Sequence, residues 1–265
     1  MTIHPAFDAD RWLAAVPDRR SRRAYDGRPV ATSDLDAIAA TADEFRPFDD
    51  ARVALVREVP AAFFTGLIGS YGKVTDAPSA LVFIADGSSA TGPEHCGYIG
   101  EGVVLEANAL GLDTCWISGS FSRSTVTAAM SLEPGEVVRA ISPVGHAAVK
   151  PTTTEALLYG ANRPKHRREL DEIAPGNAQW PDWARAGAAA ARVAPSAMNR
   201  QPWRFRMEDG AVVIAGSGPS VPIASVRLDC GIAMLHFELG ARSEGCDGAW
   251  EPLTGRDVAR WVPLD

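Results

Sequence analysis

The chain is organised around segment 194–205, which reads Ala-Pro-Ser-Ala-Met-Asn-Arg-Gln-Pro-Trp-Arg-Phe. An alanine-rich run at 182–193 precedes it and favours a helix, and the residues that follow favour a strand. Pro195 and Pro202 restrict the backbone at the two ends, and one Ser, one Asn and one Gln between them supply donors and acceptors. Composition alone predicts an ordinary turn. The order Pro-Ser-x-x-Asn-x-Gln-Pro-Trp is more specific than a turn requires.

The composition is that of an ordinary globular protein. Of the 265 residues, 46% are hydrophobic and 22% are charged, and the length allows one large domain or two small ones. The net charge of −7 disfavours a nucleic-acid-binding surface. No apolar run approaches the roughly 20 residues needed to cross a bilayer. The first residues also lack the basic start and apolar core of a signal peptide.

The cysteines indicate a reducing compartment. Cys96, Cys115, Cys230 and Cys246 form neither a Cys-x-x-Cys motif nor a zinc-binding spacing. We therefore expect buried thiols, no metal site and a cytoplasmic location.

Hydrophobic periodicity predicts helices and strands along the whole chain. The predicted helices span 10–16, 34–44, 61–72, 97–110, 124–130, 182–193 and 229–240. The predicted strands span 52–59, 80–85, a short stretch after 112, 136–149 with an interruption at 142–145, and the hairpin 203–207 with 211–215. Residues 150–180 are rich in Pro, Thr, Arg and Asn, which is typical of a long crossing connection.

A basic cluster lies near the start of the chain, at segment 19–23 (Arg-Arg-Ser-Arg-Arg), with Arg28 just beyond it. Runs of this kind are most often a solvated surface, and that interpretation stays open here. Cations this close together repel one another, and a bound anion among them would relieve the repulsion. The segment therefore predicts either a basic surface or an anion site.

The two predicted core helices repeat one another at a constant offset, which carries position 96 to position 230 and position 116 to position 250. Seven of the twenty-one positions from 96 to 116 are identical to their counterparts in 230–250. These positions are Cys96, Gly97, Leu105, Ala107, Gly111, Asp113 and Trp116. Two unrelated amphipathic helices would not share so many residues, so the sequence predicts two copies of one half-domain.

These motifs together resemble the FMN-dependent nitroreductase family, in its fused, single-chain branch. The 195–203 motif resembles the flavin-contacting loop of that family, and segment 19–23 resembles its Arg-Arg-Ser-x-Arg segment. Residues 111–116 (Gly-Leu-Asp-Thr-Cys-Trp) resemble the family's Gly-Leu-Gly-Thr-Cys-Trp, departing at Asp113. In ordinary members the loop reaches across a dimer interface to the partner's flavin. Here the arginine segment lies in the first half and the loop in the second.

The counterpart of each motif is degenerate in the other half. The first half has Phe-Arg-Pro-Phe at 45–48 in place of the loop, and the second has Lys-His-Arg-Arg-Glu at 165–169, without a serine. The resemblance therefore implies an α+β, nitroreductase-like fold with mostly antiparallel sheets flanked by helices, as an intrachain pseudo-dimer. We expect a first half at 1–150, a crossing connection at 151–180 and a second half at 181–265. We also expect a monomer.

The resemblance implies one complete FMN site shared between the halves. It assigns the phosphate to Arg19 and Ser21, with Arg20 beside them, and to Lys165 and Arg167 from the crossing segment. It places the cation of Arg23 near flavin N1 and O2. The resemblance also implies that the backbone N–H groups of Ser118 and Gly119 face flavin N5. The residues expected to cover and hydrogen-bond the ring are Pro195, Ser196, Ala197 and Asn199.

The implied function is an FMN-dependent oxidoreductase in which the flavin itself carries the chemistry. It would pass hydride from NAD(P)H to a small-molecule acceptor such as a nitroaromatic or a quinone. The alternative is a non-enzymatic protein that binds or sequesters FMN. No Ser-His-Asp order, His-Glu-x-x-His motif or P-loop competes. We expect His95 and His236 to have no catalytic role and the tryptophans to serve in packing. No nucleic-acid or membrane partner is expected.

Overall fold

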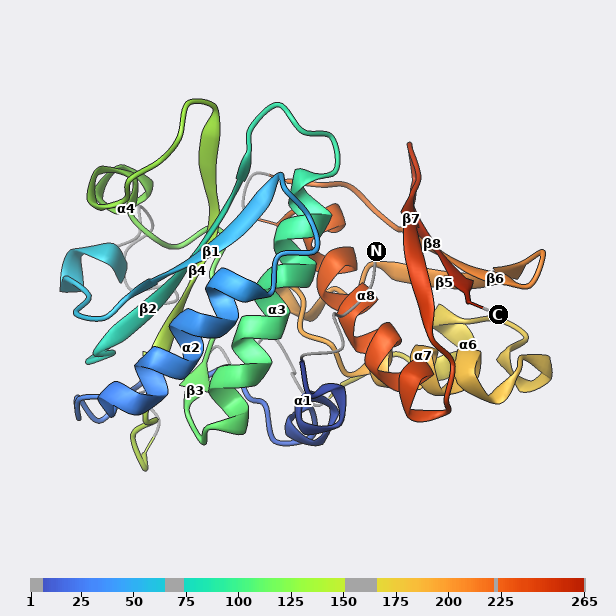
Figure 1. Cartoon of the computed structure of the whole chain (residues 1–265), viewed down its shortest axis with the longest axis horizontal. Helices are drawn as coiled ribbons and strands as arrows, with labels where there is room; N and C mark the ends of the chain where they lie inside the picture. Colours follow the sequence, from blue (N-terminus) through green and yellow to red (C-terminus); the bar gives the residue numbers. More distant parts are fainter. Residues whose placement is uncertain (1–6, 65–73, 151–165, 222–223, 265) are drawn as a thin grey trace.

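The computed structural model describes residues 7–64, 74–150, 166–221 and 224–264. Two sheets lie apart in the molecule, with the long helices α3 and α8 between them (Figure 1). The described helices are α1 (Ala9–Ala15), α2 (Thr32–Glu44), α3 (Gly92–Ala109), α4 (Arg123–Ala129), α6 (Leu170–Ile173), α7 (Asp182–Arg192) and α8 (Val226–Ser243). Short 3-10 turns are η1 (Ala61–Phe64), η2 (Asn177–Gln179) and η3 (Ala197–Asn199). The described strands are β1 (Ala51–Val56), β2 (Ser79–Asp86), β3 (Asp113–Thr114), β4 (Glu136–Gly145), β5 (Trp203–Glu208), β6 (Ala211–Gly216), β7 (Gly248–Pro252) and β8 (Asp257–Pro263).

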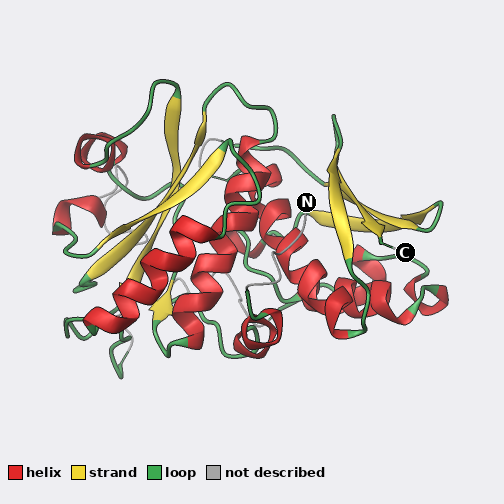
Figure 2. Cartoon of the chain, viewed as in Figure 1, coloured by secondary structure: helices red, strands yellow, loops and turns green. Residues whose placement is uncertain are grey.

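Both halves build the same sheet. The strand order is β1-β2-β4-β3 in the first and β5-β6-β8-β7 in the second, and every neighbouring pair is antiparallel. Along the chain, a long helix follows the first two strands of each half and precedes the last two; this helix is α3 in the first half and α8 in the second. Figure 2 shows the helices and the sheets as separate groups. The α+β prediction of two antiparallel half-domain repeats flanked by helices is confirmed.

Glycines let the two halves meet at the crossing of α3 and α8. A Cβ atom on Gly97 would overlap the backbone carbonyl of Leu228, and one on Gly231 would overlap that of Glu94. The two glycines are counterparts under the same constant offset that relates the two helices in the sequence. The absence of a side chain therefore permits backbone to lie against backbone, in a nearly two-fold arrangement. The hydroxyl of Tyr98 on α3 also donates to Glu238 on α8, at 2.7 Å.

Some predicted elements differ from those observed. The interruption expected at 142–145 is wrong, because β4 continues through it and Pro143 lies opposite Ala80. The nitrogen of Pro143 faces the same side as that of Ile141, since backbone N–H directions alternate along a strand. On that side of β4 the pairing is interrupted between Thr114 and Ile117, so the strand needs no N–H donor at position 143. The helix expected at 61–72 begins as the turn η1, and the rest of it lies outside the described residues.

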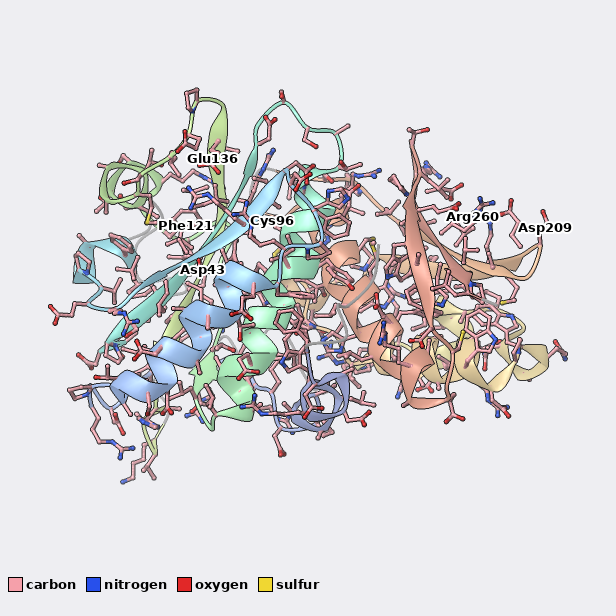
Figure 3. The ribbon with its side chains drawn as sticks, viewed as in Figure 1. Asp43, Cys96, Phe121, Glu136, Asp209 and Arg260 are labelled. Atoms are coloured by element: carbon pink, nitrogen blue, oxygen red, sulfur yellow. The ribbon has the colours of Figure 1, made fainter. Side chains whose placement is uncertain are left out.

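The β5–β6 hairpin has the turn that its sequence predicts. Asp209 and Gly210 both have positive φ, 51° and 80°, as a two-residue turn between antiparallel strands requires. Figure 3 shows Asp209 at the tip of this hairpin and Cys96 inside the molecule on α3. The four cysteines are free, and three are buried. Burial raises the pKa of Cys96 to about 12, so this thiol is unreactive at neutral pH. None of the described helices is long and apolar enough to cross a membrane.

Candidate functional site

A cavity of about 490 Å³ lies between the arginine segment of the first half and the 195–199 loop of the second. Its size is within the usual range for small-molecule and cofactor sites. Ten of the twelve residues predicted for the site line it: Arg19, Arg20, Ser21, Arg23, Ser118, Arg167, Pro195, Ser196, Ala197 and Asn199. Of the other two, Gly119 is exposed and lies outside this lining, and Lys165 is outside the described residues.

The loop over the cavity is held in an unusual backbone conformation. Ser196 is extended, and its hydroxyl oxygen accepts the N–H of Gln201 at 2.9 Å. Met198, Asn199 and Gln201 all have φ near +50°, a region that side-chain-bearing residues rarely adopt. Such clusters of strained residues persist only where the surrounding structure fixes them, and they concentrate at functional sites.

The fixing contacts come from segment 166–168, which lies beside the loop. The buried amide of Gln201 accepts from the N–H of Arg168 at 2.8 Å and donates to the carbonyl of His166 at 3.1 Å. Arg167 donates to the carbonyl of Ala194 at 2.8 Å and to Oδ1 of Asn199 at 3.1 Å. Nδ2 of Asn199 donates to His166. The Asn199 side chain, expected to hydrogen-bond a flavin ring, thus has its oxygen bonded to Arg167 and its nitrogen bonded to His166, and both bonds hold the loop to this segment.

A buried polar network lies behind the cavity, and the sequence did not reveal it. Glu101 of α3 is fully buried and accepts from the indole N–H of Trp116 at 2.6 Å. It also lies 2.9 Å from Nε2 of His236 on α8 and 4.0 Å from Nε of Arg19. Arg19 and Trp116 both line the cavity. Trp116 therefore does more than pack, and His236 is linked to the site wall through Glu101.

Asp229, at the start of α8, is a second lining residue that sequence analysis missed. It is only 2% exposed, and its Oδ1 accepts the N–H of Ala197 at 3.1 Å. Burial raises its pKa to about 7, against the lowering effects of the Ala197 hydrogen bond and of the Arg200 charge. No motif marks this residue, because its importance comes from its surroundings alone.

The corresponding region of the first half is filled by aromatic side chains. Phe48 stacks on the imidazole of His95 with ring centres 3.7 Å apart. Phe45 is buried and packs against Trp12 and Tyr98. Under the offset of the repeat, His95 occupies the position that Asp229 holds in the second half. The two halves thus share a fold while differing in what surrounds the start of the long helix.

Comparisons with known proteins agree with this architecture. The model of a family described as Putative TM nitroreductase matches residues 12–241. A putative nitroreductase from Thermotoga maritima has a similar structure, with 20% identity, a TM-score of 0.61, and coverage of 99% of this chain and 98% of that one. A nitroreductase with bound FMN from Bacteroides fragilis has 19% identity and a TM-score of 0.42, covering 55% of this chain and 95% of its own.

No curated protein matches the sequence. The likeness to the Thermotoga maritima protein extends over both halves and shows that the two chains share a fold. The family model covers most of the chain, including the arginine segment, all of α3, the loop 195–199 and α8 up to residue 241. The chain belongs to the Putative TM nitroreductase family.

Proposed function

We propose that the protein binds FMN in the cavity between its halves and acts as an FMN-dependent oxidoreductase. The observation that carries the proposal is the pairing of two groups of side chains around one cavity: the guanidinium groups of segment 19–23 and Arg167, and the polar loop 195–199. Segment 19–23 comes from the first half, Arg167 from the predicted crossing connection and the loop from the second half, so neither half alone forms the site. FMN, when bound, would accept hydride from NAD(P)H at N5 and pass it to a nitroaromatic, quinone or related acceptor.

The donors present fit such a cofactor. Arg19, Arg20, Arg23 and Arg167 bring four cations to one cavity, and the hydroxyl-bearing Ser21 lies among them. Arginine forks match phosphate oxygens, and each charge-assisted hydrogen bond contributes about 1.5–3 kcal/mol. The cavity is too apolar elsewhere to suit a free inorganic anion alone, since Leu228, Ile232 and Trp116 also form its wall. A ligand with a phosphate and an aromatic ring matches both features.

The protein's own part in the reaction would be binding, orientation and electrostatics. The cations hold the phosphate, and the charge of Arg23 would favour a ring that has gained negative charge. The loop 195–199 would exclude water from one side of the ring, and its fixed backbone would keep that cover in place. The fixed positive charge of Arg23 would raise the reduction potential of the flavin without taking part in bond making.

The proposal is tested by adding NADH or NADPH anaerobically to FMN-loaded protein and following the visible flavin absorbance. We expect bleaching by one of these donors, followed by recovery of the absorbance on addition of a nitroaromatic or a quinone. Stable yellow protein that neither donor bleaches would instead identify a flavin-sequestering protein. A preparation that binds no FMN would refute the cofactor assignment.

The matched control is Ser196→Trp, because an indole at this position would fill the cavity under the loop. Ser196 lines the cavity and is half-buried, so the indole can occupy the cavity without displacing packed side chains. We expect this variant to keep its far-UV circular dichroism and to lose FMN binding. Bleaching that persists in the variant would mean that the flavin binds elsewhere.

A further inference from the structure

Asp229 is the one carboxyl group among the residues that line the described cavity. Its Oδ1 is held by the N–H of Ala197 in the covering loop at 3.1 Å. Its Oδ2 is buried and has no hydrogen-bond partner within the described residues. A buried carboxyl oxygen without a partner is costly. It is therefore a group that a ligand in this cavity could satisfy.

The repeat shows that this arrangement is special to the second half. The equivalent position in the first half is His95, whose Nδ1 lies 2.6 Å from Oδ1 of Asp50. Its ring is also stacked on Phe48. His95 thus has a hydrogen-bond partner in Asp50 and a stacking partner in Phe48, whereas Oδ2 of Asp229 has no hydrogen-bond partner within the described residues. His95 and Asp229 are counterparts in the repeat, and Asp229 is the one that lines the described cavity.

We propose that Asp229 contacts the bound flavin ring, donating a hydrogen bond to it when protonated and repelling the acceptor atoms of its edge when ionised. This inference rests on the proposed function, because it takes FMN as the ligand. The other oxygen of the carboxyl group accepts the N–H of Ala197, so the same side chain also contacts the loop 195–199. Asp229 would therefore make FMN affinity depend on pH.

The charges around Asp229 fix the direction of that dependence. The neighbouring charged or titratable groups are Arg200 in the loop, Cys230 on α8, Glu94 on α3, and the cavity arginines Arg19, Arg20, Arg23 and Arg167. The hydrogen bond from Ala197 and the charge of Arg200 favour the ionised carboxylate, but desolvation outweighs them and raises the pKa of Asp229 to about 7. The protonated form therefore dominates below pH 7 and is lost above it. Since that form binds FMN, affinity falls as the pH rises.

The test is titration of the ligand-free protein with FMN at pH 7 and pH 8, in the wild type and in Asp229→Asn. The phosphate of FMN titrates near pH 6, below this window. The binding-competent fraction of the wild type falls from one half to about one eleventh, so we expect its Kd to increase about fivefold. The asparagine can still accept from Ala197 and has no proton to lose, so its Kd should stay constant.

A second measurement needs no variant. At pH 8, FMN binding to the wild type should take up close to one proton, measured by calorimetry in two buffers of different ionisation enthalpy. Asp182→Asn, an exposed carboxyl on α7, is the control and should behave as the wild type. Binding that is independent of pH, or that strengthens with pH because the carboxylate accepts from the ring, would overturn the inference and leave the proposed function standing. Failure of the wild type to bind FMN at any pH would overturn both.

Discussion

Replacing Asp229 by Asn is expected to stabilise the ligand-free protein at pH 8, although it removes a buried residue of the site. In the unfolded chain this carboxyl titrates near 3.8, and in the folded protein its pKa is raised to about 7. Between these two values the folded state holds a proton that the unfolded chain has released. Stability therefore decreases as pH rises through this window and levels off above pH 7. The variant has no such proton, so it escapes this loss.

The magnitude follows from the width of the window. A shift of roughly three pKa units corresponds to about 4 kcal/mol over the whole range, at about 1.36 kcal/mol per unit. Between pH 5 and pH 7 the wild type should lose about 2 kcal/mol that the variant retains. Asn keeps the acceptor for Ala197, so the loop contact is preserved in the comparison.

Urea unfolding of both proteins at pH 5 and pH 8 measures the effect, with stabilities taken by linear extrapolation. The relevant quantity is the stability of Asp229→Asn minus that of the wild type, which should increase by roughly 2–3 kcal/mol from pH 5 to pH 8. Asp182→Asn should show no such increase, because that side chain is 77% exposed. A difference that stays constant with pH, or that decreases, would show that the carboxyl is not held protonated by burial.

Five further results are expected. Arg20→Ala should weaken FMN binding by roughly 1.5–3 kcal/mol. It should not lower the stability of the apo-protein, because this side chain is exposed and donates to the nearby backbone carbonyls of residues 17 and 19. Unchanged affinity would contradict the phosphate site. Arg19→Ala should cost stability as well as affinity, since Arg19 is buried beside Glu101, and denaturant midpoints will separate it from the Arg20 variant. FMN titration should saturate at about one equivalent per chain, and two equivalents would refute a single shared site. Gly231→Val should destabilise the fold by roughly 1–3 kcal/mol or more through overpacking at the helix crossing. Light scattering of the wild type should give a monomer of 28.1 kDa.

Several features could be predicted from the residues alone, because local chemistry encodes them. The Asp209-Gly210 turn needs only residues that tolerate positive φ, so its hairpin could be predicted from the pair. Gly97 and Gly231 recur at one offset because each must let backbone approach backbone, and the repeat is therefore visible in the sequence. The resemblance to the nitroreductase family, with the arginine segment in one half and the loop in the other, implied that they meet. Residue boundaries at 150 and 180 stay predictions.

Other features depend on contacts between distant residues and could be seen only in the folded protein. Glu101 and His236 are 135 positions apart, and their pairing exists because α3 and α8 cross. The strands β7 and β8 were not predicted, since short segments pair only when a sheet offers them an edge. The raised pKa of Asp229 arises from desolvation by the residues packed around it. Burial is a property of the assembled fold, and no spacing of residues along the chain encodes it.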